Sequence, residues 1–298
     1  MADRNERGDR NERQERQERN DGRPGGQGGT NGGGKSVVRV AAVGDVHCNV
    51  NARGTSRPLF ERIADSADVM VICGDLTDHG LPAEAQVLVQ ELSASAKVPI
   101  LAVLGNHDYE SGHVDEVRKM LCDAGVQLLD GDAVEVKGIG FAGVKGFGGG
   151  FGRGTLSGFG EPAIKAFVKE ALDESMKLEA ALLRLRTPHK IAVLHYAPVQ
   201  ATVEGEPIEI FPWLGCSRLE EPINRYRVNA VVHGHAHKGA PEGKTAAGVP
   251  VYNVSVQVMR ANYPDRPPFR ILDLPAAPVA APAMPATSAE PPVETAVS

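Results

Sequence analysis

Residues 37–47 read VVRVAAVGDVH: a mostly apolar run rich in valine, then a glycine, then an aspartate and a histidine two positions apart. A short apolar run bounded by glycine is typical of a buried strand. We expect this strand over Val37–Val43, and Gly44 allows the sharp turn that follows it. Asp45 and His47 are then the first functional side chains beyond the carboxyl end of the strand.

The same order of strand, glycine and polar residue recurs along the chain. The later runs end in CGD at residues 73–75, LGNHD at residues 104–108, LH at residues 194–195 and VHGHAH at residues 232–237. In open α/β sheets the carboxyl ends of the strands lie at one edge, where the connecting loops converge. We therefore expect the Asp, Asn and His side chains of these five blocks to face one crevice.

The side chains of the five blocks have the chemistry of a metal centre. Leaving aside His107, Asp108 and His233, they comprise two carboxylates, one amide and four imidazoles: Asp45, His47, Asp75, Asn106, His195, His235 and His237. Nitrogen and oxygen donors without thiolate suit Zn, Mn, Fe or Co. A carboxylate such as Asp75 can bridge two ions about 3.5–4 Å apart, and such a pair polarises a phosphoryl oxygen and lowers the pKa of bound water. The sequence therefore predicts two divalent or trivalent metal ions and hydrolysis of a phosphoester.

Between the blocks, apolar runs alternate with helical patterns. Further strands are expected at Val69–Ile72, Ile100–Leu104, Val134–Val136, Ile139–Val144, Lys190–Leu194, Ala230–Val232 and Val249–Val254. Helices are expected at Pro58–Ser66, Pro82–Ser95, Val114–Ala124 and Glu161–Arg186. Early βαβαβ alternation followed by more strands predicts a layered α/β fold with two sheets flanked by helices.

The composition of the two ends predicts that they are disordered tails. Residues 1–35 form an acid–arginine repeat followed by a glycine-rich linker, and residues 275–298 are rich in proline and alanine. Such segments cannot bury enough apolar surface to offset the entropy of ordering. One catalytic domain is therefore expected over residues 36–274.

Charge and cysteine content limit the partners and the compartment. The net charge of −6 argues against a general nucleic-acid binder, because phosphate backbones are held by clustered Lys and Arg. The four cysteines are scattered and form no C-x-x-C pair, which favours a reducing cytoplasm. No apolar run is long enough to span a bilayer. We expect a small phosphoester substrate, no strong nucleic-acid interaction and no membrane partner.

The five blocks, in order, resemble the calcineurin-like metallophosphoesterase superfamily, with its D-x-H, G-D, G-N-H-D, H and G-H-x-H signature. The resemblance implies a β-sandwich flanked by helices. It also implies ligands for two metals: Asp45, His47 and His237 for the first, and Asn106, His195 and His235 for the second. Asp75 would bridge the two ions. His107 would be the active-site histidine, which contacts the phosphoryl group or protonates the leaving oxygen.

Departures from the family pattern narrow the branch. The Ser/Thr protein phosphatases carry G-D-x-x-D-R-G and G-N-H-E, with an arginine that binds phosphate. Here His79 stands in place of that arginine, and the third block ends in Asp108. Purple acid phosphatases place a tyrosine where this chain has Asp78. The pattern resembles bacterial phosphodiesterase-like members, so a diester substrate is expected.

Three alternatives to a phosphodiesterase are considered. A phosphomonoesterase or a nuclease of the same superfamily would use the same ligands. A non-catalytic metal-binding scaffold would be expected to have lost ligands or the active-site histidine, whereas every block is intact here.

Several residues outside the signature have competing interpretations. The glycine-rich stretch 143–154 is either a mobile surface loop or a flap over the site. In a flap, Lys145 or Arg153 would meet substrate phosphate, and Phe147 or Phe151 would meet a leaving group. His233 is expected to be structural.

Cys48, although next to His47, is expected to be a small buried hydrophobic residue, because metal-activated water makes a nucleophile unnecessary. His79 and His113 are expected in loops near the crevice, without a specific role. Trp213 is expected to pack at the mouth of the loop that follows His195.

Overall fold

The computed structural model describes residues 37–93 and 97–275 of the chain. These residues form eleven strands and seven α-helices, with short 3-10 turns between them. The predicted tails, 1–35 and 275–298, lie outside the described residues except for Pro275, which is the last residue of a strand. Within the described residues, no helix is long and apolar enough to cross a membrane.

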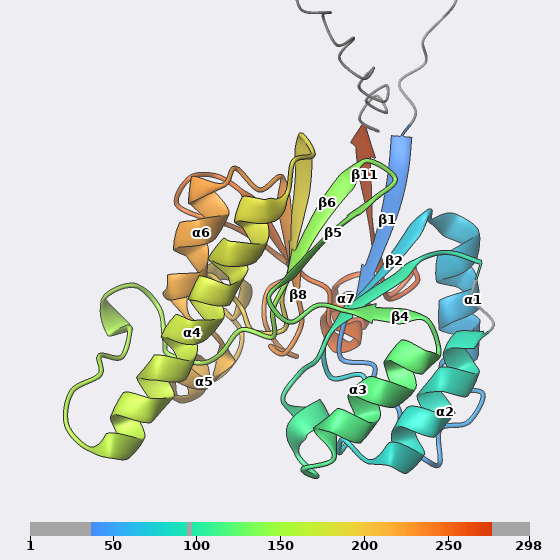
Figure 1. Ribbon diagram of the computed structural model, residues 1–298, viewed down its shortest axis with the longest axis horizontal. Helices are drawn as coiled ribbons and strands as arrows, with labels where there is room; N and C mark the ends of the chain where they lie inside the picture. The colour runs from blue at the N-terminus through green and yellow to red at the C-terminus, as the bar shows by residue number, and fades with distance from the viewer. Residues whose placement is uncertain (1–36, 94–96, 276–298) are drawn as a thin grey trace, which may run out of the picture. The chain divides into compact units, whose positions relative to one another are not determined.

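The first sheet contains the blocks that begin the signature. Its strand order is β11-β1-β2-β3-β4. The strands are β1 (Val37–Val43), β2 (Val69–Cys73), β3 (Ile100–Val103), β4 (Val126–Leu128) and β11 (Arg270–Pro275). Strands β1 to β4 are parallel, and β11 pairs antiparallel with β1. The crossovers are α1 (Arg57–Ser66), α2 (Pro82–Leu92) and α3 (Val114–Asp123), which lie on one face of the sheet (Figure 1).

The second sheet has the order β5-β6-β7-β8-β10-β9. Its strands are β5 (Asp132–Val136), β6 (Ile139–Gly143), β7 (His189–Val193), β8 (Ala230–His233), β9 (Glu242–Lys244) and β10 (Pro250–Asn253). The four central strands are parallel, and β5 and β9 are antiparallel edges. The remaining helices are α4 (Pro162–Arg184), α5 (Phe211–Leu214), α6 (Glu220–Arg225) and α7 (Val256–Asn262). Figure 1 shows α4 and α6 beside this sheet.

Successive side chains of a strand point to opposite faces of its sheet, and in this way the two sheets form three apolar cores. Val40 and Ala42 of β1 pack with Phe141 and Val193 of the second sheet, so this core lies between the sheets. Ala41, on the opposite face of β1, packs with residues of α1, α2 and α3. A third core joins the outer face of the second sheet to α4 and α6. The predicted fold, two sheets flanked by helices, is confirmed.

Strand register brings the carboxyl ends to one edge of the sandwich. Val43 is aligned with Ile72, and Cys73 with Val103, so the first three blocks begin side by side. At this edge the backbone N–H of Gly44 donates to the carbonyl of Val254 at 2.9 Å, which joins the first sheet to the chain beyond β10. The loops of both sheets therefore meet here.

Some predicted boundaries differ from the structure. The helix expected to reach Ser95 ends as α2 at Leu92. Helices α5, α6 and α7 and strands β4, β9 and β11 were not predicted. β4 and β9 have only three residues each, and the six residues of β11 show no clear alternation of apolar and polar side chains. Each of the three is an edge strand paired with a single neighbour.

Candidate metal centre

The first ligand cluster joins the first, second and fifth blocks. Asp45, His47, Asp75 and His237 each place one ligand atom within 4.8 Å of the others. The Nε2 atom of His237 lies 3.1 Å from Oδ1 of Asp45, and Nε2 of His47 lies 3.8 Å from Oδ2 of Asp75. Residues 190 positions apart along the chain thus meet at one point, as the strand-end pattern predicts.

The second cluster consists of Asp75, His195 and His235, whose ligand atoms also lie within 4.8 Å of one another. Nε2 of His195 is 3.4 Å from Oδ1 of Asp75 and 2.9 Å from Oδ1 of Asn106. Nδ1 of His195 lies 3.0 Å from the carbonyl of Cys73. A ligating histidine commonly donates its other N–H to a carbonyl, which fixes the ring and leaves the second nitrogen for the metal.

The geometry of the first cluster fits a cation. The Nε2 atoms of His47 and His237 face each other at 3.4 Å, close to two carboxylates. Nδ1 of His47 is buried and has no hydrogen-bond partner in the described residues. Opposed imidazole nitrogens beside carboxylates are the donor set that Zn, Mn, Fe or Co takes. Six of the seven residues predicted from the sequence thus lie in the two clusters, and Asn106 contacts His195 of the second cluster.

The backbone is strained at the same positions. Asp45, His47, Asp75 and His235 have φ angles of +58°, +47°, +47° and +70°. Non-glycine residues seldom adopt this left-handed region, and such conformations cluster at functional sites where surrounding structure holds them. Each of these residues follows a strand end, so the left-handed turn directs its side chain back towards the shared edge.

The glycines of the blocks make room for the carboxylates. A Cβ added at Gly105 would lie 2.1 Å from Oδ1 of Asp75, and one added at Gly234 would lie 2.2 Å from Oδ2 of Asp45. Neither glycine has a positive φ angle, so the requirement is steric. Glycine at these positions therefore permits the close approach that the sequence pattern predicts.

His107 lies next to the first cluster. Its ring packs edge-to-face on His47 with centroids 4.6 Å apart. Nδ1 of His107 donates to the carbonyl of Asp78 at 2.6 Å, which leaves Nε2 without a proton in the neutral ring and able to take one. Its backbone N–H donates to Oδ1 of Asp75 at 2.9 Å. The third block is therefore tied directly to the carboxylate shared by the two clusters.

Asp108 has a positioning role that the sequence analysis did not assign. It is fully buried and accepts hydrogen bonds from the N–H groups of Leu76, Thr77 and Gly105 and from the Thr77 hydroxyl. Burial raises its pKa despite these bonds. Asp108 thus holds the loop that carries Asp75 against the loop that carries His107. Its place directly after His107 was the only available signal.

Electrostatics favour the metal-binding form of three candidate ligands, His235, His47 and Asp45. Burial lowers the pKa of His235 to about 3, and burial also lowers the pKa of His47. Burial alone would raise the pKa of Asp45, but its hydrogen bond with His237 and the nearby histidines bring it below the ordinary value. Burial opposes protonation of His237 too, yet Asp45 raises its pKa. A cation between Asp45 and His237 would replace that proton.

Several residues outside the signature lie where the sequence predicted them. His233 is buried, with Nδ1 2.8 Å from the Gly234 carbonyl and Nε2 2.8 Å from the Thr202 hydroxyl, which confirms a structural histidine. Burial raises the pKa of Cys48 to about 12, as expected of a buried hydrophobic residue. His79 and His113 are exposed in loops, also as expected.

Trp213 is exposed, packs edge-to-face on Phe167, and has its carbonyl 3.1 Å from Nε2 of His235. It therefore lies close to the second cluster, beyond the loop that follows His195.

The glycine-rich stretch is not an exposed surface loop over most of its length. Residues 146 and 148–151 are buried, and residues 145 and 147 are partly buried. Gly149 and Gly150 donate backbone hydrogen bonds to the carbonyls of Pro212 and Gly215. Only the short turn at Gly152–Gly154 is exposed. Two successive positive-φ glycines let the chain fold back against its neighbours, which composition alone could not reveal.

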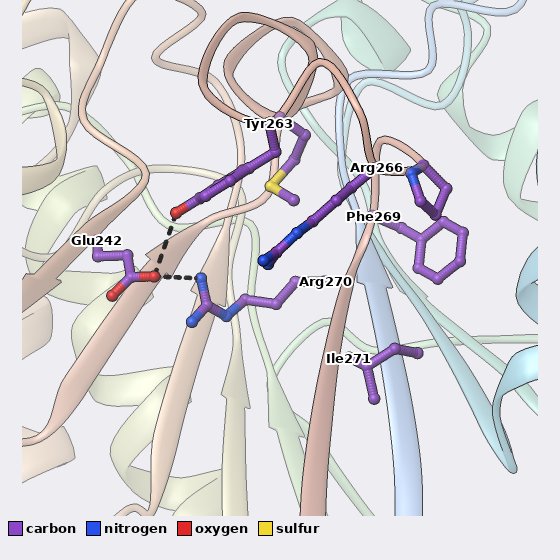
Figure 2. Close-up of a pocket in the computed structure, with 8 residues that line it drawn as sticks. Glu242, Tyr263, Arg266, Phe269, Arg270 and Ile271 are labelled. Atoms are coloured by element: carbon purple, nitrogen blue, oxygen red, sulfur yellow. Dashed lines mark hydrogen bonds and ion pairs between the residues drawn. The ribbon is translucent and has the colours of Figure 1, made fainter. Parts of the chain in front are cut away.

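A cavity of about 370 Å³ lies elsewhere, lined by residues of β9, α7 and β11 and of the loop before β11. Figure 2 shows Glu242 in it, bonded to the Tyr263 hydroxyl and to Arg270. None of its lining residues belongs to the ligand clusters.

Comparison with known proteins identifies the family and proteins of similar structure. A family model described as calcineurin-like phosphoesterase matches residues 38–239. Phosphopantetheinyl hydrolase from Mycobacterium tuberculosis has a similar structure, with a TM-score of 0.56, 16% identity, and coverage of 78% of this chain and 95% of that one. TT1561 of Thermus thermophilus has a TM-score of 0.48 and 15% identity, covering 81% and 100% of the two chains. No match was found among curated protein sequences.

A two-sheet sandwich with candidate Asp, Asn and His ligands at its strand ends, in a chain that the calcineurin-like phosphoesterase model matches, supports a metal-dependent phosphoester hydrolase. The chain belongs to the calcineurin-like phosphoesterase family, whose model spans the strands from β1 to β8 and the complete set of five blocks.

Proposed function

We propose that the chain is a dinuclear phosphodiesterase that acts on a small phosphoester. The observation that carries the proposal is the position of Asp75. Its Oδ2 atom is directed to His47 in the first cluster and its Oδ1 atom to His195 in the second. One carboxylate with an oxygen for each cluster is the arrangement needed to bridge two ions.

The ligand assignments follow the two clusters. Asp45, His47 and His237 are proposed for one ion, and Asn106, His195 and His235 for the other. When bound, the ions would activate water and neutralise charge on the phosphoryl group. Because Nε2 of His235 is close to the Trp213 carbonyl, its Nδ1 atom is the nitrogen left for a metal. The identity of the ions is proposed only as far as the donors allow: Mn, Fe, Zn or Co.

His107 is proposed to serve the leaving group. The Asp78 carbonyl holds the Nδ1 proton, so Nε2 can carry a second proton and give it to a departing oxygen. The ring is about one-third exposed, with 33% of its side-chain surface accessible, so substrate can reach it.

A diester is proposed because His79 stands where the Ser/Thr protein phosphatases carry a phosphate-binding arginine. A monoester dianion needs more positive charge than a diester monoanion. The chain's acidity argues against a nuclease, and the intact ligand set against a scaffold. Location in the cytoplasm stays a prediction.

The test uses the full chain loaded with Mn²⁺ and bis(p-nitrophenyl) phosphate as substrate. We expect two ions per chain and turnover, and we expect Asp75→Asn to lose one ion or both, with activity falling by more than about 100-fold. Asp65→Asn, an exposed carboxylate on α1, is the matched control. Less than one ion per chain would favour the non-catalytic scaffold. Faster turnover of p-nitrophenyl phosphate than of the diester would favour a phosphomonoesterase. Salt-dependent DNA cleavage would favour a nuclease.

A further inference from the structure

Lys145 lies in the loop that follows β6, against the fourth block. Its carbonyl accepts hydrogen bonds from the backbone N–H groups of His195 and Tyr196, both at 3.0 Å. The backbone of Lys145 is therefore fixed to the residue proposed as a ligand and to its neighbour. The side chain starts from a rigid position.

Aromatic rings surround the ammonium group of Lys145. Nζ lies 4.8 Å from the ring centre of Phe147, 5.3 Å from that of Tyr196 and 5.8 Å from that of Tyr109. The Tyr196 ring also packs on His235, with centroids 4.4 Å apart. Tyr109 follows His107 by two positions. The ammonium is thus one ring away from the second cluster, between the loops of the third and fourth blocks.

The positive charge of Lys145 has no ion-pair partner in residues 37–93 and 97–275. Nζ donates one hydrogen bond, to the carbonyl of Gly146 at 2.8 Å. The buried carboxylate of Glu174 is nearby, but one oxygen accepts from the Gly146 N–H and the other from Lys177, each at 2.7 Å. Burial lowers the pKa of Lys145, although Glu174 and Glu170 oppose this. Two ammonium N–H groups remain for an acceptor that is not part of the described chain.

The other residues of this loop face elsewhere. Arg153 is exposed in the turn at Gly152–Gly154. Phe151 is buried against Phe211 and Leu214 in a separate apolar cluster. Lys145 and Phe147, by contrast, lie beside Tyr196, whose ring packs on His235.

We propose that Lys145 binds a second anionic group of the substrate, a carboxylate or phosphate carried by its organic half. This rests on the proposed function, because the ligand clusters are taken to hold the scissile phosphoryl group. A hydrogen bond between an ammonium group and an anion is about twice as strong as a neutral one, and the faces of aromatic rings attract a cation. Tyr196 and Phe147 would line the path between the two anionic groups.

The test compares three inhibitors of bis(p-nitrophenyl) phosphate hydrolysis by the full Mn²⁺-loaded chain. Inorganic phosphate offers only the group held at the clusters, pyrophosphate adds a second phosphate, and phosphonoacetate adds a carboxylate. Pyrophosphate and phosphonoacetate are the two-headed inhibitors, because each carries a second anionic group. We expect Lys145→Met to raise the inhibition constant of at least one of them about tenfold or more, and to change the inhibition constant of phosphate less than about twofold. Lys145→Arg should restore most of the affinity. Lys244→Met, on the edge strand β9, is the control and should change nothing.

The pattern of results separates the alternatives. Weakening of pyrophosphate alone identifies a second phosphate, and weakening of phosphonoacetate alone identifies a carboxylate. Equal changes for all three inhibitors, or none, would overturn the assignment even if the enzyme is active. If the unmodified chain neither hydrolyses bis(p-nitrophenyl) phosphate nor binds inorganic phosphate, the proposed function itself would be overturned. Metal content is measured in each assay because both two-headed inhibitors chelate, and Lys145→Gln replaces Lys145→Met if the latter lowers the melting temperature.

Discussion

Gly105→Ala offers the sharpest test of how the strand ends create the metal centre. The added Cβ would lie 2.1 Å from Oδ1 of Asp75 and 2.3 Å from its backbone nitrogen. The nitrogen belongs to a loop tied to β2 and cannot yield as a flexible side chain would. The carboxylate must therefore rotate away or the two loops must separate. Overpacking of this kind costs about 1–3 kcal/mol of stability.

The effect on metal binding should exceed the effect on folding. Misplacing groups that support metal ligands typically costs about 10–100-fold in affinity or activity, and Asp75 serves both clusters. We expect Gly105→Ala to fold with a melting temperature lowered by about 2–12 °C and to bind metal at least about 10-fold more weakly. Calorimetric Mn²⁺ titration and thermal unfolding measure the two effects.

A matched glycine makes the experiment decisive. Gly154 also lacks a positive φ angle, and a Cβ there would meet no heavy atom within 4 Å. Gly154→Ala should therefore leave metal affinity, activity and melting temperature unchanged. If Gly105→Ala bound two ions as tightly as the unmodified chain, the steric account of the glycine in this block would be refuted.

Three further predictions concern the support of the site. In Asp108→Asn, an amide N–H₂ group would face backbone N–H groups that now donate to the Asp108 carboxylate. The free energy of unfolding, measured by chemical denaturation, should therefore fall by about 1–3 kcal/mol. An unchanged unfolding midpoint would contradict this positioning role. Thr202→Val should cost a similar amount by leaving Nε2 of His233 unpaired, yet metal content should stay at the unmodified level, and metal loss would show that His233 is more than structural. Chelation with EDTA should lower the melting temperature and Mn²⁺ should restore it, because ligands that bind only the folded state stabilise it by about 2.7 kcal/mol at roughly 100 times Kd; a melting temperature insensitive to both would argue against a preformed site.

The sequence predicted the candidate ligands because each of them follows a local pattern. A buried strand, a glycine and then Asp, Asn or His recur in four of the five blocks, and in the remaining block His195 follows its strand without a glycine. Parallel strands align their carboxyl ends. Asp45 and His237 could thus be placed together although they are 192 positions apart. The two-sheet fold followed for the same reason, since periodicity marks both the strands and the long helix α4.

Other features depended on contacts that no local pattern specifies. Strand β11 forms because β1 offers it an edge, and Asp108 gains its role only when two loops are packed together. Composition left open whether the glycine-rich loop is exposed; its hydrogen bonds to Pro212 and Gly215 bury most of it.

Lys145 shows the division most clearly. The sequence offered Lys145 and Arg153 equally as cations for substrate, because both lie in one glycine-rich stretch. Tertiary packing decided between them by placing Tyr109, Phe147 and Tyr196 around one ammonium and leaving Arg153 in an exposed turn. A sequence encodes which groups a strand end presents, whereas the surroundings of a loop side chain are set by segments distant in the chain, and only the folded structure brings these together.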